Sequence, residues 1–383
     1  MDQDVTLLIG TTKGAFLLDS PDRRGWTLRG PFCDLWPINH MTGDKAAGCI
    51  WAAGGGGWTG AGVWRSTDRG ETWTLAKLSD GEADGFLRDN PELAQTLGMT
   101  PLPPGPFTGQ FDSVWSLSMA HGRLLAGTRP AMLLCSDDGG ASWARLDGLT
   151  DHPSADSWEA GGAGLTLHTI VRHPTDPARC WVGISAAGVF GTEDHGQTWE
   201  RRNRRDNACG RAATDHPAAG SDTEVGMCVH NMVRARGEND LLYQQNHHGV
   251  LSSQDGGRNW RDVTDGLPSS FGFPIAVHPH DPATIWVLPM NGDSIGRFPP
   301  GASAAVWRSR NGGVDWAPMR AGLPQENCYF TVLRQAMTTD DHATAGLYFG
   351  TNSGSVYASA DEGETWNEIA KHLPTVLSVD LLR

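Results

Sequence analysis

Long hydrophobic runs are missing from this sequence, and so are paired cysteine motifs. The apolar stretches, such as residues 5–9, are far too short to cross a bilayer. The first residues contain no basic segment followed by an apolar one, so no secretory signal is recognisable. The seven cysteines are an odd number, widely spaced, with no Cys-x-x-Cys pair. We interpret them as reduced thiols and expect a cytoplasmic protein.

Positive charge is also scarce in this chain. Lys and Arg number 30 against 44 Asp and Glu, which gives a formal net charge of −14. Proteins that bind phosphate backbones or anionic membrane surfaces normally carry the opposite sign. The composition therefore argues against nucleic acid and against membranes as partners.

Glycine and proline, in contrast, are abundant, with 49 and 23 of the 383 residues. They are spread along the whole chain, which is typical of many short strands joined by tight turns. A hydrophobic fraction of 39% and a charged fraction of 19% exclude a disordered chain. These features predict an all-β protein.

An eight-residue repeat runs the length of the sequence. It has the form Ser/Thr-x-Asp/Asn-x-Gly-x-x-Trp, and its six copies end at Trp73, Trp143, Trp199, Trp260, Trp316 and Trp366. A shorter copy ends at Trp26. Successive copies are 46 to 70 residues apart, close to the length of one four-stranded propeller blade. We interpret each copy as a turn closed by its Asp and Gly, with the Trp packed between sheets.

These copies resemble Asp-box (BNR) repeats, and the chain resembles a β-propeller of the sialidase-like superfamily over essentially its whole length. The resemblance implies a seven-bladed β-propeller, and we expect residues 1–383 to form a single domain. Residues 376–382 read as a lone strand that joins the N-terminal strands in one blade and closes the ring. Propellers with this repeat include sialidases, xyloglucanases, receptors and assembly factors, so the resemblance specifies the fold and leaves the function open.

One face of the predicted ring carries the long loops. Residues 75–112, 145–166 and 201–228 connect the last strand of one blade to the first strand of the next, and residues 289–304 form a long connection within a blade. Propeller geometry places all of these on the face opposite the repeated turns. Loops of this length in a compact fold are usually functional. We therefore predict the working face there, around the central axis.

Three histidines, His40, His168 and His230, open innermost strands at that face. Converging imidazoles could bind a divalent transition metal such as zinc, iron or copper. His168 and His230 could alternatively act as catalytic acid or base groups, and all three could simply be channel-mouth residues bonded to water. Cys228 is a possible soft ligand, but a buried thiol is the simpler interpretation.

Other side chains at this face could bind a substrate. We expect Arg129 to hold an anionic group, with His247, Asn231, Trp115 and Phe273 around it. The sialidase resemblance implies a catalytic Tyr and Glu, for which Tyr329 and Glu326 are the candidates. The three-arginine clamp and the Arg-Ile-Pro signature that it also implies are missing, so sialidase activity is not expected. An aromatic wall is the alternative role for Tyr329.

These patterns favour an intracellular hydrolase or lyase that acts on a small-molecule or glycan-like substrate in a His-lined axial pocket that could bind a metal. A glycosidase would need two carboxylates flanking the bond, and no distinctive pair is present. The alternative is a non-catalytic protein-binding or assembly scaffold.

Overall fold

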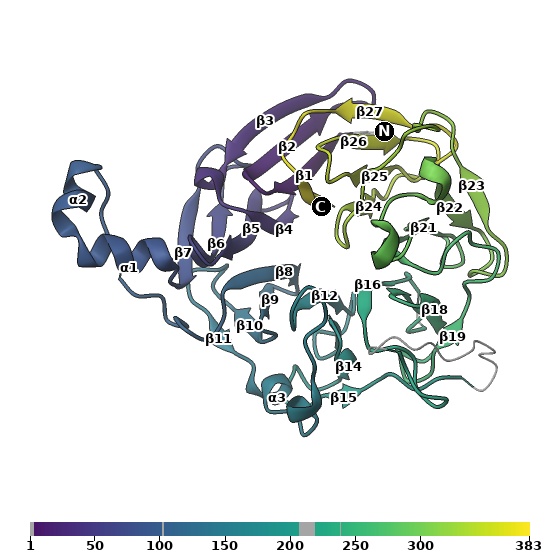
Figure 1. Ribbon diagram of the computed structural model, residues 1–383, viewed down its shortest axis with the longest axis horizontal. Helices are drawn as coiled ribbons and strands as arrows, with labels where there is room; N and C mark the ends of the chain where they lie inside the picture. The colour runs from purple at the N-terminus through teal and green to yellow at the C-terminus, as the bar shows by residue number, and fades with distance from the viewer. Residues whose placement is uncertain (1–3, 102, 207–218, 238) are drawn as a thin grey trace.

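The protein folds into seven four-stranded antiparallel sheets arranged around a central axis (Figure 1). The computed structural model describes residues 4–101, 103–206, 219–237 and 239–383. The prediction of a seven-bladed β-propeller is confirmed. No helix in these described ranges is long and apolar enough to traverse a bilayer.

Six blades follow one another along the chain, each with its first strand nearest the axis (Figure 1). Their strands are β4–β7 (Ile38–Asp44, Cys49–Gly56, Gly60–Ser66, Thr74–Ser79), β8–β11 (Ser113–Ala120, Arg123–Arg129, Leu133–Ser136, Ala144–Arg145), β12–β15 (Leu167–Arg172, Cys180–Ile184, Gly188–Thr192, Glu200–Arg201), β16–β19 (Val229–Arg234, Leu242–Asn246, Gly249–Ser253, Arg261–Asp262), β20–β23 (Gly272–Val277, Ile285–Pro289, Val306–Ser309, Ala317–Met319) and β24–β27 (Met337–Thr339, Leu347–Gly350, Val356–Ser359, Asn367–Ala370).

The seventh blade combines the two ends of the chain. Strand β28 (Val376–Leu381) forms its innermost strand and pairs with β1 (Val5–Thr11), which continues through β2 (Gly14–Ser20) to β3 (Thr27–Phe32). The register places Leu381 opposite Leu7 and Val379 opposite Ile9. The predicted closure of the ring is thus confirmed, and the innermost strand of this blade has a hydrogen-bonded partner.

The hydrophobic core lies between neighbouring blades. Each sheet presents apolar side chains to the next, and the largest fully buried side chains include Trp181, Trp260 and Trp286. Some tryptophans of the second strands also bond to the following blade. The Nε1 of Trp181 donates to the carbonyl of Gly256 (2.8 Å), and that of Trp286 donates to the carbonyl of Glu362 (3.1 Å). The tryptophan side chains thus stabilise contacts between blades as well as the repeated turns.

Each copy of the eight-residue repeat forms the turn between the third and fourth strands of a blade. In the first full copy, the amide and hydroxyl of Thr72 donate to the Asp68 carboxylate (2.9 and 2.5 Å). The amide of Gly70 donates to the Ser66 hydroxyl (2.8 Å). Gly70 has a φ of +91°, and a Cβ there would lie 2.5 Å from Leu17. The predicted roles of Asp and Gly in the turn are confirmed.

The Asp residues of these turns should make the stability of the fold sensitive to acid. Hydrogen bonds from Thr72 lower the pKa of Asp68 to about 2 from the ordinary value of 3.8, and those from Thr198 lower the pKa of Asp194 to about 2. Because the folded-state pKa is depressed, this contribution to stability is present above pH 3.8 and is lost as the pH falls towards 2. We expect the free energy of unfolding, measured by chemical denaturation, to decrease across that window.

Thr72→Val provides the matched variant for this prediction. It removes the hydroxyl donor at an exposed position, so the pKa of Asp68 should rise. The variant should be less stable than the wild type at pH 6 and should converge towards it at pH 2. Equal differences in stability at both pH values would contradict the proposed linkage.

The long loops lie at the end of the ring opposite the repeated turns. The amide of His247, in the turn between β17 and β18, donates to the carbonyl of Cys228 just before β16 (2.9 Å), and Met290 and Phe271 are paired in the same way (2.8 Å). The turns that follow the second strand of each of these blades therefore lie on the same face as the starts of the innermost strands. Of the predicted loop at 201–228, residues 207–218 lie outside the described residues.

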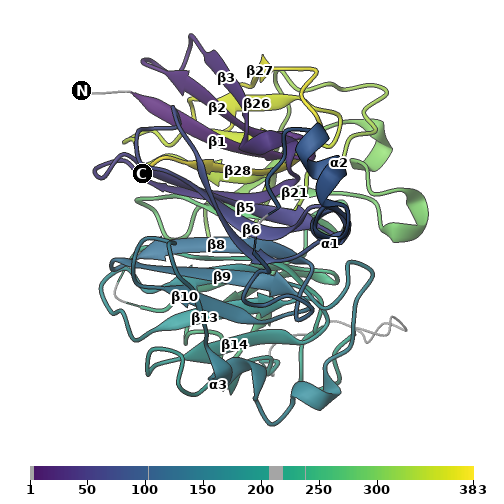
Figure 2. The ribbon, with the colours of Figure 1, turned by 90° about the vertical axis from the view of Figure 1, so that its left-hand side faces the viewer.

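Among the described parts of these loops, two contain α-helices. The connection after β7 contains α1 (Glu82–Asp89) and α2 (Pro91–Thr96), which project from the edge of the ring (Figures 1 and 2). The connection after β11 contains α3 (Asp147–Thr150). Exposed apolar side chains gather around the projecting pair: Trp58, Phe86, Leu93, Leu97 and Met99.

Candidate functional site

The candidate site lies at the axis, where β16 and β20 begin. Cys228, His230 and His247 each offer a ligand atom, and these three atoms lie within 4.8 Å of one another. We call these three residues the imidazole–thiol cluster. Cys228 and His230 are buried, whereas His247 retains partial exposure.

His230 is held in one orientation by its surroundings. Its Nδ1 lies 2.6 Å from the Gly272 carbonyl, which can only accept, so Nδ1 carries the proton and Nε2 the lone pair. Burial lowers the pKa of His230 well below its usual value, and the nearby Arg334 lowers it further. His230 is therefore a neutral imidazole with a defined tautomer.

The thiol of Cys228 lies in the same buried environment. Burial raises its pKa, while the charge of Arg334 acts in the opposite direction. Its Sγ is 3.9 Å from the Ser185 hydroxyl. In the absence of a bound cation the thiol is therefore protonated at neutral pH.

Aromatic rings and two guanidinium groups complete the site. Phe273 lies 4.7 Å from the His230 ring between ring centroids, and Phe271 contacts both His230 and His247. The guanidinium of Arg334 lies over the Phe273 ring at 4.7 Å, and that of Arg297 lies at 5.7 Å from it. Arg297 is paired with Asp293 at 2.6 Å.

Arg334 differs from Arg297 because Asp293 influences its charge electrostatically but forms its ion pair with Arg297. The guanidinium of Arg334 makes no ion pair or hydrogen bond with any residue in the described ranges, and its Nε is buried. Burial lowers the pKa of Arg334 to about 10, so the side chain remains charged at neutral pH. Part of its surface is still accessible. A largely buried cation that forms no ion pair is costly, and an anionic ligand would relieve that cost.

The position of Arg334 depends on an irregular segment. The innermost strand of this blade, β24, begins only at Met337. Phe330, which precedes it, packs against Phe349 and Tyr357 in the core. The residues between Phe330 and Met337 form no strand. They place the Arg334 carbonyl 2.6 Å from the side-chain Nδ2 of Asn231, which donates to it.

The other predicted histidines lie outside the imidazole–thiol cluster. His40 accepts a hydrogen bond from the Leu117 amide through Nδ1 (2.9 Å) and so links β4 to β8. His168 is buried, with Nδ1 3.2 Å from the Thr169 hydroxyl. Burial lowers its pKa well below the usual value, and it is close enough to His230 to influence that residue electrostatically.

The predicted substrate-binding residues fall into two separate groups. His247 and Phe273 lie at the imidazole–thiol cluster, and Asn231 bridges Thr169 and Arg334 beside it. Arg129 lies over Trp115 at 5.3 Å, and Asp112 accepts from it at 3.0 Å. The charge of Arg129 is therefore already compensated.

Tyr329 and Glu326 do not form the pair that the sialidase resemblance implies. Tyr329 is 63% exposed and contacts Phe298 edge to face at 5.0 Å. Glu326 is exposed, and no hydrogen bond joins it to Tyr329 in the part of the chain that the structure describes. The arrangement agrees with the alternative role of Tyr329 in an aromatic surface.

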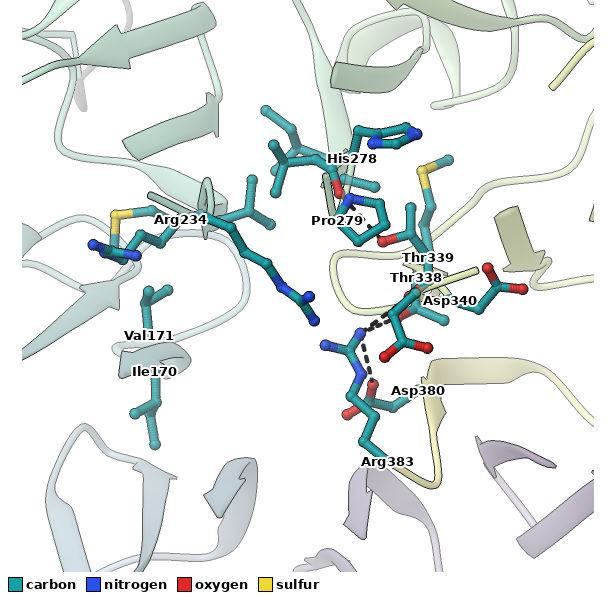
Figure 3. A pocket seen from close by; sticks show the side chains of 18 residues that line it. Ile170, Val171, Arg234, His278, Pro279, Thr338, Thr339, Asp340, Asp380 and Arg383 are labelled. Carbon is teal, nitrogen blue, oxygen red and sulfur yellow. Dashed lines mark hydrogen bonds and ion pairs between the residues drawn. The ribbon is translucent and has the colours of Figure 1, made fainter. Parts of the chain in front are cut away.

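A cavity of about 310 Å³ lies at the other end of the axis, lined by the far ends of the innermost strands (Figure 3). Arg234 and Arg383 point towards each other across it (Figure 3). Arg234 is paired with Asp240 at 3.4 Å, and Arg383 donates to the Thr339 carbonyl at 3.2 Å. Because these cations have partners within the protein, the cavity makes a weaker case for an anion site than Arg334 does.

Comparisons with known proteins support the fold. No protein-family model matches the chain. The oligoxyloglucan-reducing end-specific xyloglucanase of Emericella nidulans is 23% identical over 217 residues, covering 50% of this chain and 25% of that enzyme. The GH74 xyloglucanase from Xanthomonas campestris superposes with a TM-score of 0.63 at 19% identity, over 96% of this chain and 52% of the enzyme.

A solved structure that contains a bound peptide also has a similar fold. YCF48 bound to a D1 peptide superposes with a TM-score of 0.51 at 12% identity, over 86% of this chain and 81% of YCF48. This chain is a propeller similar to GH74 xyloglucanases. It spans a quarter to about half of the length of the xyloglucanases that it matches.

Sequence reasoning missed Arg334 and Arg297, and it considered Cys228 as a possible ligand but favoured a buried thiol. The Cys-x-His spacing at 228–230 was the available signal, because alternate residues of an extended segment point to the same side. Nothing in the sequence marked Arg334, since its place depends on where the irregular segment before β24 folds.

Proposed function

We propose that this propeller is a hydrolase or lyase that acts on a small anionic, glycan-like substrate at the axial end where β16 and β20 begin. We also propose that its repeated turns are Asp-boxes of the sialidase-like superfamily. The unpaired guanidinium of Arg334 beside the neutral His230 carries the functional proposal. A cation without a protein partner is suited to bind an anionic group, and a neutral imidazole is suited to transfer a proton.

The two residues have complementary roles in this proposal. Arg334 orients a carboxylate or similar group of the substrate and stabilises negative charge that develops on it. His230, with Nδ1–H held by the Gly272 carbonyl, accepts a proton at Nε2. In hydrolysis that proton comes from water, whose oxygen bonds to the anomeric carbon as the glycosidic C–O bond breaks. In an elimination it comes from the carbon next to the substrate carboxylate, and a C=C bond forms as the C–O bond at the adjacent carbon breaks. In both cases the departing oxygen takes a proton from solvent water.

The glycan-like substrate class is supported by the similarity to xyloglucanases. The test is a panel of uronate-containing and neutral oligosaccharides of equal length. New reducing ends without ultraviolet absorbance would indicate hydrolysis, and an unsaturated, absorbing product would indicate a lyase. Cleavage of neither set, or equal cleavage of both, would contradict the proposal.

Arg334→Met gives a further prediction with two readouts. Loss of a charge-assisted contact should raise KM for the anionic substrate about 10- to 100-fold and leave neutral ligands unaffected. Because an unpaired charge is removed from a desolvated position, Tm should stay the same or rise. Arg310→Met is the control, since Arg310 is exposed and paired with Glu362. A fall in Tm with unchanged KM would assign Arg334 a structural role.

A protein-binding function is the second candidate, and the projecting helices favour it. Phe86 in α1, and Leu97 and Met99 just after α2, are between 50% and 57% exposed. YCF48, a propeller of similar fold, was solved with a bound peptide. Solvent exposure of apolar side chains gathered in this way is typical of an interaction surface. If the oligosaccharide panel gave no turnover, this candidate would become the leading one.

A further inference from the structure

Three potential metal ligands meet where the chain enters β16. Cys228 and His230 are two residues apart in an extended segment, so their side chains lie on the same side of it. The turn containing His247 is attached to this segment, because its amide donates to the Cys228 carbonyl (2.9 Å). The three ligand atoms consequently lie within 4.8 Å of one another.

We propose that Cys228, His230 and His247 bind one Zn²⁺ ion. Thiolate and imidazole are preferred ligands of zinc, and no carboxylate belongs to this group. The inference adds a cofactor to the site of the proposed function. With zinc bound, Nε2 of His230 would be a ligand, so a zinc-bound water, and not His230, would supply the base of that reaction. The metal site can be tested without any activity measurement.

The environment of His230 is that of a metal ligand. Metal-bound histidines usually donate their second ring N–H to a carbonyl or carboxylate, which orients the ring. The Gly272 carbonyl accepts from Nδ1 of His230 in this way. Nε2 is therefore the nitrogen that can bind zinc.

The three ligand atoms need only small movements to reach the distances of a zinc site. Zinc bonds of about 2.0–2.3 Å in a tetrahedral site place ligand atoms about 3.3–3.7 Å apart. Ligand atoms at up to 4.8 Å reach that distance by movements of about 1 Å.

The coordination would leave one position open. Among the described residues, no fourth His, Cys, Asp or Glu belongs to the group. Three protein ligands with a water or substrate in the fourth position are typical of catalytic zinc. Zinc bound to one thiolate carries a net positive charge, so together with Arg334 it would favour an anionic group at that position.

The test is zinc content and affinity of the untagged protein after chelator treatment and dialysis against ZnCl₂. We expect one zinc per chain. Cys228→Ser and His230→Ala should each weaken zinc binding more than about 100-fold. Mutating a residue that only hydrogen-bonds to a metal ligand typically lowers metal affinity about 10- to 100-fold. Co²⁺ in place of zinc should give a thiolate charge-transfer absorption that Cys228→Ser abolishes.

Controls separate ligand loss from misfolding. Cys49→Ser and His121→Ala alter a cysteine and a histidine outside the group and should retain zinc. If the buried substitutions do not fold, His247→Ala changes a partly exposed ligand and should still lose zinc with an unchanged Tm in the metal-free state. Retention of zinc by the folded Cys228→Ser, His230→Ala or His247→Ala proteins, or its absence from the wild type, would overturn the proposal.

The outcomes also distinguish the cofactor from the function. Zinc binding without turnover on the oligosaccharide panel would uphold the metal site and reject the proposed reaction. Turnover that survives chelation and Cys228→Ser would reject the metal site and retain the reaction.

Discussion

Replacing His230 with alanine should lower kcat on the anionic substrate by about 10²–10⁴-fold, the usual contribution of a positioned acid–base group. His230 is buried beside Arg334 and Phe273, and its proton position is set by the Gly272 carbonyl. Its loss removes the proton acceptor without removing the anion-binding guanidinium. Substrate affinity should consequently change much less than kcat, as steady-state kinetics would show.

A second buried histidine supplies the matched control. His278 is 6% exposed and lies at the opposite end of an innermost strand, where its Nδ1 accepts from the Asp281 amide (3.0 Å). His278→Gln should lower the free energy of unfolding and leave kcat unchanged. Equal losses of kcat in both variants would mean that activity follows fold stability, and His230 would lose its catalytic assignment.

Deleting residues 376–383 should prevent the chain from folding. Val376, Val379, Leu381 and Leu382 are all less than 9% exposed. At about 1.5–3 kcal/mol for each buried side chain, their loss is comparable with the whole stability of a typical domain, about 5–15 kcal/mol. The deletion also exposes one edge of β1. We expect insoluble protein, or soluble protein without cooperative unfolding by circular dichroism.

A circular permutant tests whether the strand or the covalent connection is needed. The Leu382 amide donates to the Thr6 carbonyl (3.0 Å), so the end of β28 lies beside the start of β1. Moving residues 376–383 in front of residue 4 through a short turn should restore folding. Lys371→Ala, at an exposed position in the preceding connection, should have no effect. A stable truncated protein would show that the ring does not depend on this strand.

The proposed site shows where sequence reasoning was sufficient and where it was not. His230 was identified from its place at the start of an innermost strand, and its buried position agrees with that reasoning. His40 occupies an equivalent position, and its ring likewise bonds to the next blade, at the Leu117 amide, yet it lies outside the imidazole–thiol cluster. The direction of a side chain at the axis depends on the neighbouring blade, and strand position alone does not specify it.

Arg129 and Arg334 illustrate the same difference for charge. The sequence suggested Arg129 as the anion-binding group, but Asp112 accepts from it at 3.0 Å. Arg334 lacks such a partner within the described ranges. Whether an arginine is available to a ligand depends on which carboxylates fold beside it, and those can be remote in sequence.

The sequence by itself determined the turns, the number of blades and the closure of the ring. These features depend on local chemistry, such as the Asp68 and Gly70 turn, or on the order of strands along the chain. Tertiary structure alone decided which functional groups meet. Residues 228, 247, 272 and 334 come from different blades or loops, and their approach to within a few ångströms depends on how neighbouring blades pack and on where the irregular segment before β24 folds.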